Sequence, residues 1–397
     1  MLKLLIIADD FTGALDTGVQ FSSRGAKTKV ITDPQYDLSL ANELDVLVWD
    51  SETRHLASEK AYEIVNNFVK RVVSRFPNIN IYKKTDSGLR GNIGSELSAA
   101  MDAIGVDKMA FIPAFPAMNR VTKNCIHYID GVPVAQSVFG KDPFEPVKNS
   151  DVNTIIAEQT DKTAIKVYDA ETDDDMKKIA DKLGAEGLKL TAGCAGFAEI
   201  LASLLGFNGK CGEIGVMPSK FFMICGSVNP VTRQQMDYAE AHGFKRICLT
   251  VEQKLNENWP KSQECEQVAK IWLKEIESCH AILDANDPNE IQKTNEFIKS
   301  HNLSINQVRI RISKAITGAA KFLLDNGLEA RLMCVGGDTL LALMQYVGVN
   351  ELVPICEIEK GVVLTSFTYN NKKYNVMTKS GGFGEKDLLV KIADYNK

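Results

Sequence analysis

Short apolar runs alternate with segments of helical periodicity along most of the chain. The expected strands in the first part are 2–8, 27–32, 45–50, 79–84 and 108–114, and the expected helices are 12–24, 58–76 and about 93–104. The helix at 58–76 follows Ser58, a candidate N-cap, and carries apolar side chains three and four positions apart. This alternation predicts a parallel sheet covered by helices on both faces.

The alternation stops between residues 115 and 147, where Pro, Gly and Asn are frequent. We expect a long loop there, with a hairpin through 128–134, that lines or covers a ligand site. Strands and helices alternate again over 163–206 and from 221 onward, where one long helix is expected at 312–326. A second hairpin is expected over 362–378, turning at Asn370 and Asn371.

The length of the chain indicates two domains, because 397 residues exceed the size at which single cores stop growing. A Gly-Lys-Cys-Gly stretch at 209–212 and Pro218 separate the two series of elements, which places the boundary near 207–219. The predicted fold class is therefore α/β with two domains, 1–212 and 213–397. Each is expected to be a mostly parallel sheet flanked by helices.

Composition narrows the classes of protein that fit. The chain is 45% hydrophobic and 24% charged, which is typical of a globular protein, and its net charge of −5 argues against a nucleic-acid partner. Carboxylates interrupt the first apolar run too early for a signal peptide, and no apolar run is long enough to span a bilayer. We expect a cytoplasmic protein without a membrane partner. Nine scattered cysteines without a C-x-x-C pair are expected to be reduced.

Four segments share one layout: an apolar run, a cluster of Gly with charged or hydroxyl residues, and a helical run. They are 4–18, 81–97, 332–344 and 375–392. In open α/β sheets, ligands bind beyond the carboxyl ends of the strands, where helix N-termini face outward. The first two clusters carry carboxylates and cations, as a polar metabolite requires. The last two are glycine-rich, as a polyphosphate held by backbone amides requires. This division indicates a kinase.

The candidate substrate residues lie in the first half. Asp9 and Asp10 are adjacent carboxylates that repel each other unless a cation, ligand hydroxyls or a helix N-terminus compensates. Asp10 would alternatively serve only as a helix cap. The densest polar cluster comprises Lys83, Lys84, Thr85, Asp86 and Arg90. Its cations suit a substrate carboxylate and Asp86 suits proton acceptance, although a solvated turn with internal ion pairs is the alternative. Arg54 would reach the same edge.

The candidate nucleotide residues lie in the second half. Neither a Walker loop nor the G-x-G-x-x-G fingerprint follows any expected strand, so a nucleotide must be held differently. The candidates form two glycine clusters, Gly336, Gly337, Asp338 and Thr339, and Gly381, Gly382, Phe383 and Gly384. Glycine lets a phosphate approach the backbone, and a helix N-terminus attracts its charge. The 336–339 cluster alone would equally be a tight turn with an Asp cap. Ser227 is a weaker third candidate for the nucleotide site.

Taken together, the motifs resemble the four-carbon acid sugar kinases, which phosphorylate threonate, erythronate and related acids with ATP. The resemblance rests on IADDFTGALDTG (7–18), DSETRHL (50–56), KKTDSGLRGNIGSEL (83–97), FIPAFPAMNRVT (111–122), AGCAGFA (192–198), CGSVNPVTRQQ (225–235), GGDTLLAL (336–343) and TKSGGFG (378–384). It implies an active site in the cleft between the domains, with the sugar acid on the first domain and the nucleotide on the second.

The resemblance also assigns roles to the candidates. It implies substrate contacts for Asp9 or Asp10, Arg54 and 83–86, and nucleotide contacts for Ser227, 336–339 and 381–384. We expect ATP with Mg²⁺, and Asp338 to orient the metal. The substrate carboxylate is expected on Arg54, Lys83, Lys84 and Arg90. Asp86 is expected to accept the proton of the substrate hydroxyl, with Asp10 as the competing candidate.

Several alternatives stay open. Family members often have Ser-Thr-Leu-Arg-Gly where this chain has Gly88 at the second position of 87–91, which leaves the exact acid undecided. A kinase for 3-oxo-tetronate or another small hydroxy acid is the alternative among enzymes. A non-catalytic protein that closes two domains on an anionic metabolite would explain the first cluster without needing the second. The sequence also leaves a homodimer open.

Overall fold

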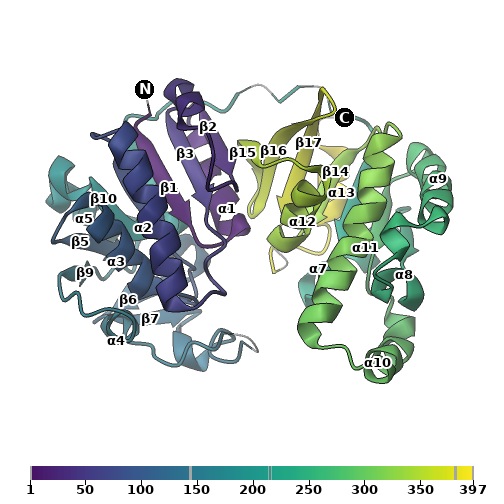
Figure 1. Ribbon diagram of the computed structural model, residues 1–397, viewed down its shortest axis with the longest axis horizontal. Coiled ribbons are helices and arrows are strands. Elements are labelled where there is room, and N and C mark those ends of the chain that lie inside the picture. Colours follow the sequence, from purple (N-terminus) through teal and green to yellow (C-terminus); the bar gives the residue numbers. More distant parts are fainter. Residues whose placement is uncertain (1, 143–144, 213, 216, 380–381, 396–397) are drawn as a thin grey trace. The chain divides into compact units, whose positions relative to one another are not determined.

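The protein consists of two compact units, each with its own sheet. The computed structural model describes residues 2–142, 145–212, 214–215, 217–379 and 382–395. The first unit is Met1–Gly212 with Glu351–Pro354, and the second is Glu213–Asn350 with Ile355–Lys397. In both units most strands are parallel and helices flank the sheet, as the alternating pattern predicts (Figure 1).

The first unit is built on a parallel sheet whose edge is extended by one antiparallel strand. Along the sheet its parallel strands are β2 (Thr28–Ile31), β3 (Val46–Asp50), β1 (Leu4–Ala8), β4 (Asn80–Lys84), β10 (Leu190–Gly193), β5 (Met109–Ile112) and β9 (Ile165–Val167). The start of β15 (Glu351–Glu359) pairs antiparallel with β2. The helices are α1 (Phe11–Ser22), η1 (Leu38–Glu43), α2 (Ser58–Arg75), α3 (Ile93–Ile104), η2 (Pro116–Met118), η3 (Val134–Gln136), α4 (Val152–Ala157), α5 (Asp173–Gly187) and α6 (Ala195–Leu204).

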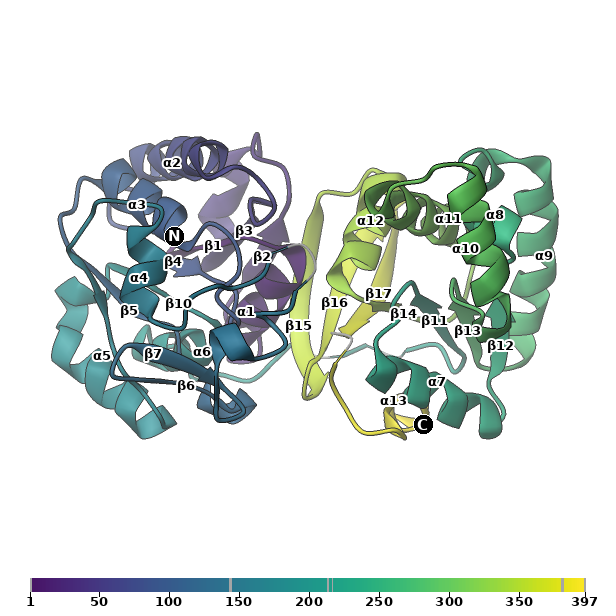
Figure 2. The ribbon, with the colours of Figure 1, turned by 90° about the horizontal axis from the view of Figure 1, so that it is seen from below.

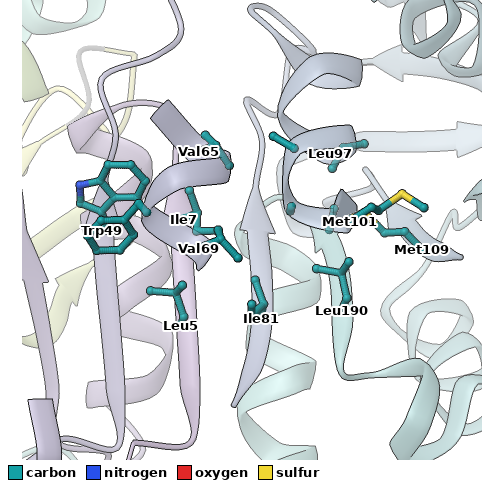
Figure 3. Close-up of a cluster of buried hydrophobic side chains, with 14 of the residues drawn as sticks. Leu5, Ile7, Trp49, Val65, Val69, Ile81, Leu97, Met101, Met109 and Leu190 are labelled. Atoms are coloured by element: carbon teal, nitrogen blue, oxygen red, sulfur yellow. The ribbon is translucent and has the colours of Figure 1, made fainter. Parts of the chain in front are cut away.

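Helices cover both faces of this sheet. Figure 2 shows α2 and α3 on one face and α1 and α6 on the other. The core beneath α2 and α3 is drawn in Figure 3, where side chains of the strands point toward those of the two helices: Leu5, Ile7, Trp49, Ile81 and Leu190 from strands, and Val65, Val69, Leu97 and Met101 from helices. Leu5 and Ile7 of β1 lie two positions apart, because side chains alternate between the faces of a strand. Residues such as Ile81 therefore face α2 and α3, and their neighbours in sequence face α1 and α6.

A small antiparallel sheet forms within the segment that was expected to be a long loop. Its strands are β6 (Arg120–Lys123), β7 (Ile126–Ile129) and β8 (Val132–Pro133). The predicted hairpin over 128–134 is therefore only part of the structure, since β6 adds a further strand before it. The pattern was too short to reveal β6, which contains four residues.

The second unit repeats the architecture with different connections. Its strands in sheet order are β12 (Lys245–Cys248), β13 (Ala281–Asp284), β11 (Phe221–Cys225), β14 (Arg331–Val335), β17 (Lys372–Lys379) and β16 (Val362–Tyr369), of which β16 runs antiparallel to β17. Its helices are α7 (Pro230–Ala241), α8 (Val251–Leu255), η4 (Trp259–Lys261), α9 (Gln263–Ser278), η5 (Pro288–Glu290), α10 (Ile291–Ser300), α11 (Ile305–Asp325), α12 (Gly337–Val347) and α13 (Leu388–Asp394). Figure 2 shows α11 and α12 on one face of the sheet and α7 and α13 on the other.

Of the turns and helix starts predicted from local sequence signals, some are confirmed and others are wrong. The turn at Asn370 and Asn371 is present, with φ of 48° and 60°, as a tight hairpin between β16 and β17 requires. Ser58 is not the N-cap of α2 but its first residue, and its hydroxyl donates to Asn92 instead. The long helix of the second unit starts at Ile305 rather than 312, because Ser304 caps it together with Gln307. No helix in the described part of the chain is both long and apolar enough to cross a membrane.

Candidate active site

The carboxyl ends of β3, β1 and β4 lie side by side, and each is followed by residues predicted to bind substrate. Ala8 at the end of β1 is the register partner of Asp50 on β3 and of Lys84 on β4, so the three loops start at one level. The helix after β1 covers one face of the sheet, whereas those after β3 and β4 cover the other (Figure 2). Such a switch point is where open α/β sheets bind ligands.

The charged side chains at these strand ends form a first cluster, which comprises Asp9, Asp10, Arg54, Lys83, Lys84, Asp86 and Arg90. Arg54 is at its centre and is 8% exposed. Its Nε and Nη2 donate to the two oxygens of Asp9 at 2.8 and 3.1 Å, and its Nη1 donates to Asp10 Oδ2 at 2.7 Å. Nη2 also lies 3.7 Å from Asp86 Oδ1. Burial acts to lower the pKa of Arg54, but Asp10, Asp9 and Asp86 raise it well above its usual value. The guanidinium thus holds together carboxylates that would otherwise repel one another.

Asp9 and Asp10 differ in their access to solvent. Burial acts to raise the pKa of Asp9, but Arg54 and the nearby lysines outweigh it and the pKa is lowered. Asp10 keeps 27% of its side chain exposed. Its Oδ1 accepts the Gly13 amide at 2.9 Å and so caps α1. Asp10 therefore combines the cap function, raised as the simpler interpretation, with a place in the charged cluster. It is also the more exposed carboxylate of the pair.

Asp86 is held by Arg90 in a bidentate ion pair. Arg90 Nε donates to Asp86 Oδ2 at 2.8 Å and Nη2 donates to Oδ1 at 3.1 Å, and the amides of Gly88 and Arg90 add two further bonds to Oδ2 at 3.2 Å. Arg90 Nη1 also donates to Asp142 at 3.0 Å. Burial acts to raise the pKa of Asp86, but Arg54 and Arg90 bring it far below its usual range. Asp86 and Arg90 are therefore largely occupied with each other.

Lys83 and Lys84 point to opposite faces of β4, as strand alternation requires. Lys83 faces α3, where its ammonium lies 2.6 Å from Glu96 Oε2 and is not exposed at all. A substrate contact by Lys83 would require this buried pair to break. Lys84 faces α1, where its Nζ donates to the Thr85 carbonyl at 2.7 Å and would lie 2.9 Å from a Cβ placed on Gly13. Among the described residues no carboxylate pairs with Lys84.

The segment with the small sheet contacts the loop that follows β4. His127 on β7 is buried between Thr122 Oγ1 and the Ser87 carbonyl, each 3.0 Å from a ring nitrogen. Because a carbonyl only accepts, Nε2 carries the proton and Nδ1 accepts from the threonine. Burial lowers the pKa of His127 to about 4, so the ring is neutral near pH 7. Gly88 lies under Phe139, whose ring would be 2.4 Å from a Cβ at position 88.

The second cluster lies at the carboxyl ends of β11 and β14, which are neighbours in the sheet. Here too the following helices, α7 and α12, cover opposite faces (Figure 2). Gly336 precedes α12 with φ of 92°, a conformation that favours glycine, and no side chain caps this helix. Thr339 Oγ1 lies within 4 Å of the Cβ positions of both Gly336 and Gly226. The structure thus brings 336–339 together with the loop containing Ser227.

The glycine-rich loop before α13 is held by hydrogen bonds from α7. Gln235 on α7 donates through Nε2 to the carbonyls of Phe383, Gly384 and Glu385 at 2.9 to 3.0 Å. The Phe383 ring packs on Gly361, where a Cβ would lie 2.6 Å away. A Cβ on Gly382 would instead meet only Asn229 Nδ2 at 3.8 Å. The protein itself therefore does not require glycine at 382. Gly381 lies outside the described residues.

Lys379 at the end of β17 was missed by the sequence analysis. It is 1% exposed, is the register partner of Val335, and its Nζ lies 3.3 Å from Thr232 Oγ1. Burial lowers the pKa of Lys379 to about 8. The signal was present in the sequence, since only Ser380 separates this lysine from the glycines of TKSGGFG.

Asp338, the predicted metal ligand, lies in the first turn of α12 with 79% of its side chain exposed. The described residues contain no cluster of three or more His, Cys, Asp or Glu side chains that could hold a metal ion. Mg²⁺ is commonly held by one or two carboxylates together with nucleotide phosphates and water. A single exposed carboxylate beside a glycine-containing helix N-terminus fits that mode of binding and does not fit an all-protein cage.

Comparison with known proteins agrees with a charged site in the first unit and a glycine-rich site in the second. The family model described as a sugar-binding N-terminal domain matches residues 4–168, and the one described as a nucleotide-binding C-terminal domain matches residues 222–389. The chain belongs to the four-carbon acid sugar kinase family. The fold of a crystal structure from Salmonella typhimurium LT2 is similar, with a TM-score of 0.83 at 19% identity, covering 100% of this chain and 99% of the other.

Two curated members of the family match over nearly their whole length. A D-erythronate kinase from Heliobacterium modesticaldum is 27% identical, covering 100% of this chain and 97% of its own. A D-threonate kinase from Salmonella typhimurium is 26% identical, covering 99% and 98%. Proteins named 3-oxo-tetronate kinase match at 21% to 23% identity. The similarity is thus greater to the erythronate and threonate kinases.

Proposed function

We propose that this protein is an ATP-dependent kinase that phosphorylates a hydroxyl of a four-carbon sugar acid such as D-erythronate or D-threonate. The observation that carries the proposal is the pair of strand-end sites with different chemistry within a full-length match to this family. The first site is lined by buried ion pairs, and the second by glycine loops and a helix N-terminus. A kinase needs both, whereas a metabolite sensor needs only the first.

In this proposal Asp10 accepts the proton of the attacking hydroxyl. Each oxygen of Asp10 has one hydrogen bond and the side chain is partly exposed, so a hydroxyl can reach it. Asp86 is the weaker candidate, because its Oδ2 already accepts three bonds and two arginines keep its pKa far below its usual range. The base contributes less than positioning does in phosphoryl transfer, which leaves little covalent work to the protein.

The nucleotide phosphates are proposed to bind the backbone amides of 336–339 and 381–384, beside Ser227. Lys379 adds positive charge beneath this loop, since its buried ammonium ends the strand next to β14. Asp338 would hold Mg²⁺ through its exposed carboxylate. When bound, the metal would neutralise negative charge on the phosphates during transfer.

The proposal is tested by ADP release from ATP and Mg²⁺ over a panel of four-carbon acids. The panel contains both stereoisomers of threonate and erythronate, 3-oxo-tetronate, and erythritol as an acceptor without a carboxylate. We expect turnover with D-erythronate or D-threonate that exceeds the ATPase background and the rate with 3-oxo-tetronate. Turnover of 3-oxo-tetronate alone would show that this acid, and not D-erythronate or D-threonate, is the substrate. Acid binding without ATP binding would favour the non-catalytic alternative.

A further inference from the structure

Arg120 differs from the other arginines around the first cluster because it has no acidic partner. Arg54 is paired with Asp9 and Asp10, and Arg90 is paired with Asp86 and Asp142. Within the described residues the guanidinium of Arg120 makes no ion pair and no hydrogen bond, and its Nε is buried without a partner. Burying a donor of a charged group without a partner is unfavourable, so such donors are usually satisfied by a protein group, water or a ligand.

The position of Arg120 is fixed by its surroundings. Its backbone closes the turn after β5 through two hydrogen bonds with Phe115, at 2.7 and 3.2 Å. Its guanidinium lies over the ring of Phe139 at 5.4 Å, and that of Arg90 lies over the same ring at 5.1 Å. Phe139 can approach this closely because Gly88 has no side chain beneath it. The arrangement holds Arg120 beside the loop that carries Asp86 and Arg90.

Arg120 and Lys84 are both near Cys194, which follows β10: Lys84 is the register partner of Gly193, and the Cys194 thiol lies 3.2 Å from the carbonyl oxygen of Ala114, next to the turn that Arg120 closes. Burial raises the pKa of the Cys194 thiol at the end of β10, and the charges of Lys84 and Arg120 both counteract that rise. These are also the two cations of the cluster that form no ion pair within the described residues, although the charge of Lys84 helps to lower the pKa of Asp9 and Asp86. An anion that binds near both would satisfy them without disrupting any ion pair. Arg54 and Arg90 each already donate three hydrogen bonds to internal carboxylates, so less of their charge is left for an anion.

We propose that Arg120, together with Lys84, binds the carboxylate of the sugar acid, and that Arg54 and Arg90 instead position Asp9, Asp10 and Asp86. The inference rests on the proposed function and names the residue that recognises the acid group of the substrate. It also assigns Gly88 and Phe139 the task of holding Arg120, which is the point where this chain departs from the Ser-Thr-Leu-Arg-Gly pattern.

The test compares an acid with a polyol that lacks the carboxylate. Affinities of the Arg120→Ala variant and the wild-type protein are measured by calorimetry for D-erythronate, D-threonate, erythritol and ATP. Loss of a charge-assisted contact should weaken binding of the acid by about 10- to 100-fold. Affinity for erythritol and ATP should stay the same. Arg120→Lys should recover part of the loss, because it restores the charge without the planar fork. Lys123→Ala, at the exposed end of the same strand, is the matched control and should not change any of these values.

The outcomes separate the inference from the proposed function. Wild-type affinity for the acid in a folded Arg120→Ala variant would overturn the inference and leave the kinase proposal standing. An equal loss for acid and polyol would also overturn it, because the lost contact would not be to the carboxylate. A weaker affinity for ATP alone would place Arg120 at the nucleotide instead. Wild-type protein that binds neither acid would contradict the proposed function itself. Thermal unfolding of each variant shows whether it is folded.

Discussion

The two clusters prepare for an anionic ligand in opposite ways. In the first unit the charges are already arranged in ion pairs, with Arg54 8% exposed and Lys83 and Glu96 almost completely buried. In the second unit the candidate groups are backbone amides beside glycines, the carboxylate of Asp338 is exposed, and Lys379 is the buried cation at the adjoining strand end. The first site is thus built from side chains that depend on one another, and the second from backbone that leaves room for a ligand.

This difference has a consequence for mutations. Removing one member of a buried ion pair leaves the other without compensation, so substitutions in the first cluster affect folding as well as function. Substituting a glycine in a ligand-binding loop weakens ligand binding but does not lower protein stability, provided that the new side chain meets no protein atom. Stability and function should therefore be coupled in the first unit and separable in the second.

The largest expected effect is on catalysis at Asp10. Asp10→Asn keeps an N-cap for α1, because asparagine caps helices as well as aspartate, but it removes the proton acceptor. We expect kcat to fall by about 10² to 10⁴, with both ligands still bound. Steady-state ADP release and calorimetry measure the two quantities. Asp151→Asn changes the same type of cap at α4 and should leave kcat unchanged. Full activity in Asp10→Asn together with loss of activity in a folded Asp86→Asn variant would transfer the role to Asp86.

The next effect is on stability at the buried pair of the first unit. Glu96→Gln leaves the Lys83 ammonium buried without its counter-ion, 2.6 Å from the substituted group. We expect the free energy of unfolding in urea to fall by roughly 3 to 5 kcal/mol. Glu186→Gln breaks an exposed pair with Lys189 and should cost less than about 1 kcal/mol. Equal losses in the two variants would show that the first cluster does not depend on its buried pairs.

A smaller effect is expected on nucleotide affinity at the glycine loop. A Cβ at Gly382 meets only Asn229 at 3.8 Å, so Gly382→Val should fold with an unchanged melting temperature. If phosphate approaches this backbone, the added side chain should weaken ATP binding by at least about tenfold, which is 1.4 kcal/mol. Gly212→Val is the matched control, since a Cβ there has no atom within 4 Å. Unchanged ATP affinity in Gly382→Val would remove this loop from the site.

The smallest expected effect is on the pH dependence of ATP binding. Burial lowers the pKa of Lys379 to about 8, and a bound phosphate would favour its ammonium form. ATP affinity should therefore fall by about tenfold between pH 7 and 9, as Lys379 loses its proton in the free protein. Lys379→Met should abolish this dependence, whereas Lys386→Met, at an exposed lysine, should retain it. The same slope in both variants would assign the titration to another group.

In the ligand-free protein, Lys379 gives the stability of the fold the opposite pH dependence. Because the folded pKa of Lys379 lies below the ordinary value of 10.5, the unfolded chain binds more protons between about pH 8 and 10.5. The contribution of Lys379 to stability therefore rises with pH over that window. Urea unfolding of the wild-type protein and of Lys379→Met at pH 8 and 10 measures the difference.

Much of the fold followed from the sequence because the signals are local. The apolar runs predicted β1, β3 and β4, and Asn370 with Asn371 predicted the hairpin, since each depends on residues within a few positions. The short strand β6 and the short helices α4 and α8 were not predicted, because four to six residues carry too little periodicity. Ser58 failed as an N-cap because Asn92, far away in sequence, binds its hydroxyl.

The fold class, the family and the strand ends at which charged or glycine-rich residues gather can all be predicted from the order of residues. Which of those residues contact one another depends on how the chain folds. Spacing could not show that Lys83 faces Glu96, that Asp86 is occupied by Arg90, or that Arg120 lacks an acidic partner. The physical reason is that the electrostatic state of a side chain depends on burial and on partners brought near by the sheet, and these partners lie up to tens of positions away along the chain.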